Sequence, residues 1–95
     1  MVVPRVYKVK VTVTGIRGKH KCWQGHEVGD SWLFDDNETR ANFCQTAFYA
    51  VYPAIAFFRQ GGRNWWATDE TANVINVSCP DPEVLVQYEV RRLPD

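Results

Sequence analysis

The sequence has no excess of charge of either sign, because eleven Lys and Arg residues balance eleven Asp and Glu residues. A neutral chain has no electrostatic reason to bind nucleic acid or an anionic membrane, so we expect neither as a partner. Internal repeats, linkers and low-complexity tracts are absent, and Met1-Val2-Val3-Pro4-Arg5 lacks a signal-peptide pattern. We therefore predict one domain, residues 1–95, in the cytoplasm with reduced thiols.

Long hydrophobic runs are confined to residues 43–58, where only Gln45 and Thr46 are plainly polar. As a helix this segment would rise about 24 Å, which is shorter than the roughly 20 residues of a membrane span. We expect it to be the main helix of the core, with Pro53 producing a kink or two short helical pieces. Its apolar side repeats at helical spacing, and its opposite side is also apolar, with Phe48, Tyr49, Tyr52 and Phe57.

Strands are predicted at 5–14, 31–34, 73–79 and 84–92, where apolar and polar residues alternate or β-formers cluster. Segments 15–21 and 63–70 are expected to be loops. This order predicts an α+β fold, an antiparallel sheet of about four strands with one main, Pro-kinked, largely buried helix. One sheet cannot cover both sides of that helix, so we expect a homodimer or a ligand pocket on its far side.

Three cysteines and one histidine could form a metal site. Cys22, His26, Cys44 and Cys79 all lie near predicted ends of elements, and three thiolates with one imidazole suit tetrahedral zinc, or iron. The Cys-x2-Cys spacing typical of such sites is missing. The alternative is that the cysteines are small core side chains.

Two further interpretations need no metal. Cys44, near a helix N-terminus, could be a reactive thiol, with His26 as its base and Asp30 orienting the imidazole. Alternatively, Trp23, Arg63, Trp65 and Trp66 could line an aromatic pocket for a small molecule, served by His26 and Asp30 as acid–base groups. The same aromatic residues could instead cover the helix, meet a second subunit, or bind a partner enzyme.

The ordered motifs resemble those of a family of small, functionally uncharacterised bacterial and archaeal proteins of about 90 residues. Its signature is C-x3-H-x2-G-D, then C, Y-P, G-G and C-P-D. Two departures are visible: Trp23 stands where family members often have proline, and residues 40–43 replace a glycine-containing segment. The resemblance implies that the Cys and His residues act together, and it brings no established activity. The signature falls here on Cys22, His26, Gly29, Asp30, Cys44, Pro53, Gly61, Gly62, Cys79, Pro80 and Asp81.

Overall fold

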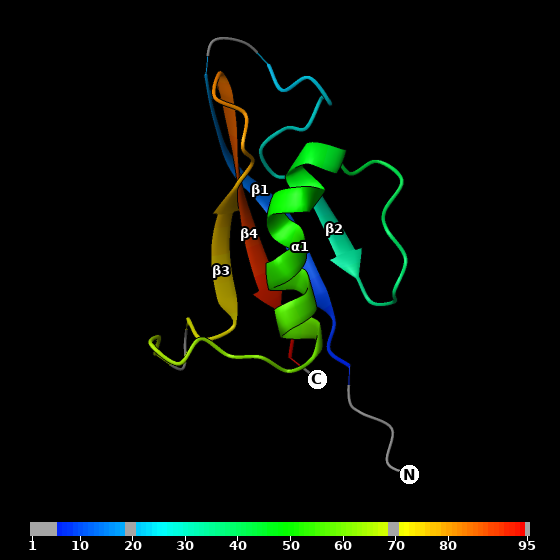
Figure 1. Cartoon of the computed structure of the whole chain (residues 1–95), viewed down its shortest axis with the longest axis vertical. Helices are drawn as coiled ribbons and strands as arrows, with labels where there is room; N and C mark the ends of the chain where they lie inside the picture. The colour runs from blue at the N-terminus through cyan, green and yellow to red at the C-terminus, as the bar shows by residue number, and fades with distance from the viewer. Residues whose placement is uncertain (1–5, 19–20, 69–70, 95) are drawn as a thin grey trace.

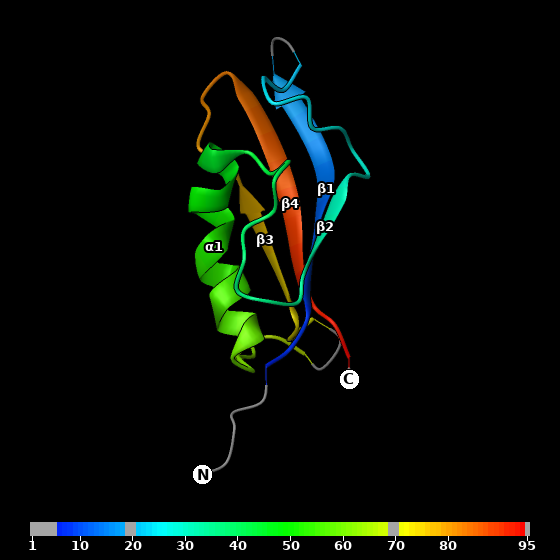
Figure 2. The ribbon, with the colours of Figure 1, turned by 90° about the vertical axis from the view of Figure 1, so that its right-hand side faces the viewer.

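A computed structural model describes residues 6–18, 21–68 and 71–94. It contains the strands β1 (Val9–Gly18), β2 (Ser31–Phe34), β3 (Val74–Ser78) and β4 (Val84–Arg92), and the helix α1 (Gln45–Arg59). The strands form one antiparallel sheet in the order β2-β1-β4-β3, and α1 covers one face of it (Figures 1 and 2). The predicted α+β fold is therefore confirmed.

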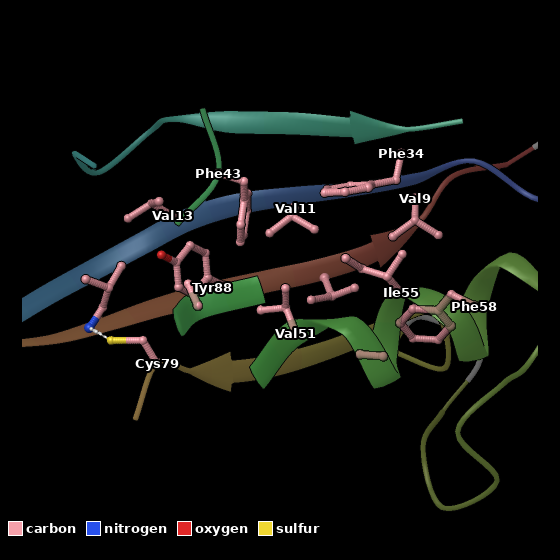
Figure 3. Close-up of a cluster of buried hydrophobic side chains, with 14 of the residues drawn as sticks. Val9, Val11, Val13, Phe34, Phe43, Val51, Ile55, Phe58, Cys79 and Tyr88 are labelled. Carbon is pink, nitrogen blue, oxygen red and sulfur yellow. Dashed lines mark hydrogen bonds between the residues drawn. The ribbon is translucent and has the colours of Figure 1, made fainter. Parts of the chain in front are cut away.

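The core lies between α1 and the inward face of the sheet (Figure 3). Alternation along β1 and β4 places every second side chain on this face, as the sequence predicts. The helix contributes residues spaced three or four apart, so its buried stripe follows the helical repeat. The strand residues are Val9, Val11, Val13, Val84, Val86, Tyr88 and Val90, and the helix residues are Ala47, Val51, Ala54, Ile55 and Phe58.

Helix α1 is one element rather than two short pieces, with Pro53 inside it on the exposed side. It ends just before Gly61 and Gly62: Gly61 has a positive φ of 89°, and its N–H donates to Phe58 O at 3.0 Å. Tyr49 and Tyr52 on the outward side remain 82% and 53% exposed, so the helix is buried on one side only.

Strand β1 differs from its predicted bounds at both ends. It continues to Gly18 instead of ending at Thr14. Its pairing with β4 shifts in register between Val13 and Gly15 of β1. Gly18 permits this extension because its φ is 148° and a Cβ there would lie 2.2 Å from Glu83 O. At the other end, Arg5 lies outside the described residues, and Tyr7 N–H donates to Arg59 O at the end of α1 (2.9 Å).

The described residues contain no helix with the length and apolar character needed to cross a bilayer.

Candidate functional site

The three cysteines come from separate segments and line one cavity of about 110 Å³, which we call the thiol pocket. Cys22 begins a turn closed by Gly25 N–H donating to its carbonyl (2.9 Å). Cys44 is the N-cap of α1, and Cys79 directly follows β3. All three thiols are free. The other lining residues are Trp23, Gln24, Thr46, Ala47, Asp81, Val84, Val86 and Tyr88.

Cys79 is the buried member of the set. Its Sγ accepts a hydrogen bond from Val86 N–H at 3.2 Å, drawn in Figure 3, and donates to Val84 O at 3.5 Å. The backbone N–H of Cys79 also donates to Val86 O at 2.9 Å. These contacts fix the sulfur between β3 and β4, so Cys79 has a structural role in addition to lining the pocket.

Cys44, like Cys22, packs its side chain against the hydrophobic core, but among the described residues its sulfur makes no backbone hydrogen bonds of the kind that hold Cys79 Sγ. Its backbone is extended (φ −63°, ψ 130°) and its carbonyl accepts the first helical hydrogen bond from Phe48 N–H at 2.8 Å. No side chain caps α1, and its first turn carries no acidic residue. The Cys44 side chain is half-buried, as is that of Cys22, so both remain within reach of a ligand.

His26 supports the start of α1 from outside the thiol pocket. Its Nε2 accepts a hydrogen bond from Cys44 N–H at 3.1 Å, which assigns the proton of the neutral ring to Nδ1. The imidazole is buried and packs against Trp32 and Phe43, with ring centroids 4.7 and 5.7 Å away. This burial lowers the pKa of His26 below its usual value, and the negative charge of Asp30 partly opposes the effect.

Asp30 organises the turn that carries His26. Its Oδ2 accepts a hydrogen bond from Glu27 N–H at 2.9 Å, and its own N–H donates to Glu27 O at 3.0 Å. Asp30 and His26 line a shallow depression of about 370 Å³ next to the thiol pocket, with Gln24 in the lining of both. The predicted pair therefore shares a surface, where Asp30 acts on the imidazole through its charge.

Tyr88 is a pocket residue that the sequence did not single out. It lies on the inward face of β4 with Val84, Val86 and Val90, and its hydroxyl is the only polar side-chain group among these four residues. Burial raises the pKa of its hydroxyl, and the three cysteines, when ionised, raise it further. Tyr88 therefore keeps its proton at neutral pH and can act as a hydrogen-bond donor beside the thiols.

The predicted aromatic ligand set is divided between two places. Trp23 lines the thiol pocket and is 81% exposed, so it forms part of the rim. Trp65 and Trp66 pack edge-to-face on each other, with centroids 5.7 Å apart, in the loop between α1 and β3. Those two residues and Arg63 line neither the thiol pocket nor the depression beside His26.

The four predicted metal ligands do not form a coordination shell in this conformation. Across residues 6–18, 21–68 and 71–94, no three His, Cys, Asp or Glu side chains are placed to hold one ion. His26 Nε2 accepts a hydrogen bond from Cys44 N–H, and the Cys79 thiol donates its proton to Val84 O. A metal would need these contacts to rearrange.

Fold and site together define a small α+β protein with a cavity lined by three thiols. Comparison with family models, curated proteins and solved structures finds no match to the chain. The family resemblance carried by the motifs therefore stays a prediction.

Proposed function

We propose that the protein binds a small, uncharged electrophile in the thiol pocket and holds it through the sulfur of Cys44. The observation that carries this proposal is the meeting of three free thiols from distant segments around one cavity. Free thiols of this kind fit a reducing compartment, so we also propose a cytoplasmic location.

The pocket itself limits the ligand. A volume of about 110 Å³ suits a small ligand, since a protein cavity of about 150 Å³ holds benzene. Among the described residues of the lining, Asp81 is the only charged one, and its Oδ1 accepts hydrogen bonds from Glu83 N–H and Val84 N–H at 2.8 and 3.2 Å. With a carboxylate and no cation among these described lining residues, an anionic ligand is disfavoured.

Cys44 is the proposed nucleophile because its sulfur is half-buried, its side chain makes no cap hydrogen bond, and it stands at the N-terminus of α1, where the first N–H groups lack an intrahelical partner. With a small aldehyde, sulfur would form a bond to the carbonyl carbon, and the C=O π pair would move to oxygen. That oxygen would take up the proton released by the thiol, giving a neutral hemithioacetal without any oxidant. The protonated hydroxyl of Tyr88 could donate a hydrogen bond to the developing oxyanion.

The test compares wild type with Cys22→Ser, Cys44→Ser and Cys79→Ser during alkylation by iodoacetamide, with the modified residue mapped by mass spectrometry. We expect Cys44 to react at least about tenfold faster than Cys79, with the fast phase missing only in Cys44→Ser. A short-chain aldehyde should slow that phase by occupying the pocket. Equal rates in urea provide the control. The proposal fails if Cys44 reacts no faster than Cys22 in the folded protein, or if aldehyde does not slow its alkylation.

A second candidate is a zinc or iron ion held by Cys22, Cys44 and Cys79, with His26 or a ligand in the fourth position. It is favoured by the N–H donor at Cys79 Sγ, since such bonds support a ligating thiolate. Elemental analysis of protein purified without a metal-chelating tag distinguishes the two candidates. Near-stoichiometric metal, lost to a chelator together with protection of the thiols, would favour the metal site. Metal-free protein with a fast Cys44 would favour the first proposal.

A further inference from the structure

The outer edge of β3 is open along the strand. β3 is the last strand of the sheet, and no described segment lies alongside its outer side in Figure 1. Its sequence, Val-Ile-Asn-Val-Ser, contains no charged residue and no proline. Natural sheets commonly protect such an edge with lysine, proline, a bulge or a covering segment, because it can pair with another strand.

The hydrogen bonds at the two ends of β3 identify the residues whose backbone groups point outward. Arg92 N–H donates to Asn73 O at 2.8 Å, and Cys79 N–H donates to Val86 O at 2.9 Å. Residues bonded to the neighbouring strand alternate in an antiparallel ladder, so 73, 75, 77 and 79 face β4. Residues 74, 76 and 78 therefore direct their N–H and C=O groups away from the sheet.

Two of these outward residues have backbone groups without a partner among the residues that the structure describes. Val74 is already satisfied within the chain, since its N–H donates to Thr71 O at 3.2 Å and its carbonyl accepts from Asn64 Nδ2 at 2.8 Å. Pro80, the next position in the outward series, has no N–H. The open segment is thus limited to Asn76 and Ser78, which lie on either side of Val77.

We propose that two copies of this chain pair through β3, with a two-fold axis at Val77. Antiparallel pairing about that residue places Asn76 of the first copy opposite Ser78 of the second, and Ser78 of the first copy opposite Asn76 of the second. Each pair can exchange two backbone hydrogen bonds, so all of the free groups on the two edges find partners. A pairing centred on Asn76 would instead place Ser78 opposite Val74, whose N–H already has a partner. The open segment is therefore complementary to itself in one register.

Exposed aromatic surface lies near the same edge. Asn64 N–H donates to Ala72 O at 3.0 Å, which ties the loop bearing Trp65 and Trp66 to the start of β3. Trp65 and Trp66 are 88% and 68% exposed, which corresponds to roughly 300 Å² if each ring has about 200 Å² of surface. A standard interface buries about 800 Å² per partner, so these rings and the strand edge together could supply much of it. A net charge of zero adds no repulsion between copies.

The two-fold arrangement also predicts which segments meet. Because the strands run in opposite directions, the beginning of β3 in one copy lies beside the end of β3 in the other. The loop with Trp65 and Trp66 would then approach the turn at Cys79-Pro80-Asp81 of the second copy. Cys79 and Asp81 line the thiol pocket, so dimer formation would bring a tryptophan-bearing loop close to that cavity.

The test is the mass of the full chain in solution, measured by sedimentation over a range of concentrations, with Asn76→Pro as the main variant. Proline at this outward position removes an N–H that β4 does not use, so the fold should persist by circular dichroism. We expect wild type to have twice the 11.0 kDa chain mass. Asn76→Pro should raise the dimer dissociation constant by about tenfold or more, because both copies lose a hydrogen bond.

Leu33→Lys, on the opposite edge strand β2, is the matched control and should leave the dimer intact. Amide exchange gives a second measure: Asn76 and Ser78 N–H should become protected as concentration rises. Wild type that stays monomeric at every concentration would overturn the proposal. So would a dimer that survives Asn76→Pro but is broken by Tyr49→Arg, since that result places the interface on the outward side of α1.

Discussion

Replacing His26 by phenylalanine tests whether this histidine supports the start of α1. Phenylalanine keeps a ring that can pack against Trp32 and Phe43 but removes the Nε2 acceptor of Cys44 N–H. A partly buried N–H left without an acceptor costs about 1–3 kcal/mol, so we expect His26→Phe to lower the free energy of unfolding by that amount at pH 7. His26→Ala should cost more, because it also removes the ring contacts.

The same contact predicts how stability depends on pH. Burial lowers the pKa of His26 in the folded protein below its value near 6.5 in the unfolded chain. The unfolded state therefore binds more protons below pH 6.5, and folding stability falls as pH decreases toward the folded-state pKa. The slope from one such group cannot exceed about 1.4 kcal/mol per pH unit. His26→Phe should reduce this slope, since phenylalanine binds no proton.

Urea unfolding of wild type and His26→Phe at pH 7.5, 6.5 and 5.5 measures both effects. The only other histidine, His20, lies outside the described residues and is present in both proteins, so the difference between their slopes isolates His26. Two results would refute the reasoning: equal free energies of unfolding at pH 7.5, or the same loss of stability on acidification. Either would mean that Cys44 N–H does not depend on the neutral imidazole.

Three other substitutions test the packing around the site. Gly18→Ala should cost about 2 kcal/mol or more in urea unfolding, because its Cβ would lie 2.2 Å from Glu83 O, and a cost below about 0.5 kcal/mol would contradict the close approach of β1 and β4. Cys79→Ala should cost about 1–3 kcal/mol, because Val86 N–H loses its sulfur acceptor in the core; a neutral result would show that this contact is unimportant. Tyr88→Phe should remove the tyrosine absorbance change that appears only on alkaline unfolding, as followed in the ultraviolet; a titration curve unchanged by the substitution would contradict the raised pKa of Tyr88.

The sequence predicts the sheet and helix well because their patterns are local. Alternation marks the inward residues of β4 from Val84 to Val90, and the helical repeat marks the buried side of α1 from Ala47 to Phe58. The bounds of β2 and β4 are also as predicted. These patterns are visible in the sequence because each element has one buried and one exposed side. The periodicity of apolar residues therefore follows burial directly.

Features that depend on distant partners could not be predicted in this way. Segment 15–18, Gly-Ile-Arg-Gly, has no strand alternation, and it becomes part of β1 only because β4 offers a partner after the bulge between Val13 and Gly15. The role of His26 is hidden for the same reason, since its acceptor nitrogen meets a backbone N–H eighteen residues further along the chain. Neither pairing leaves a periodic signal in the sequence.

The outward side of α1 is exposed, although the sequence predicted a second subunit or a ligand pocket there. The apolar residues opposite the core predicted a second subunit or a pocket, and Tyr49 and Tyr52 are indeed left uncovered within the chain. Tyr52 also lines a groove of about 710 Å³ between α1 and residues 36–39. Polar backbone groups are more specific than apolar area in choosing a partner, which is why the proposed dimer is built on β3 rather than on this side.

Three polar residues of the sequence signature, His26, Asp30 and Asp81, make hydrogen bonds that stabilise the fold. His26 accepts the N–H of Cys44, Asp30 closes the turn at Glu27, and Asp81 closes the turn at Glu83. These contacts would be needed in a protein with no ligand at all, so they do not by themselves indicate a function.

The sulfur atoms of Cys22 and Cys44 are the exception. They are half-buried and free, and within the described part of the chain they make no hydrogen bond comparable to that of Cys79 Sγ with Val86 N–H. Both side chains also pack against the hydrophobic core, and a thiol at the rim of a small cavity adds nucleophilicity and affinity for soft ligands. The chemistry of this protein should therefore be sought first at these two sulfurs. If Cys22→Ser and Cys44→Ser together change neither stability nor the binding of any electrophile or metal, the thiol pocket has no function in this fold.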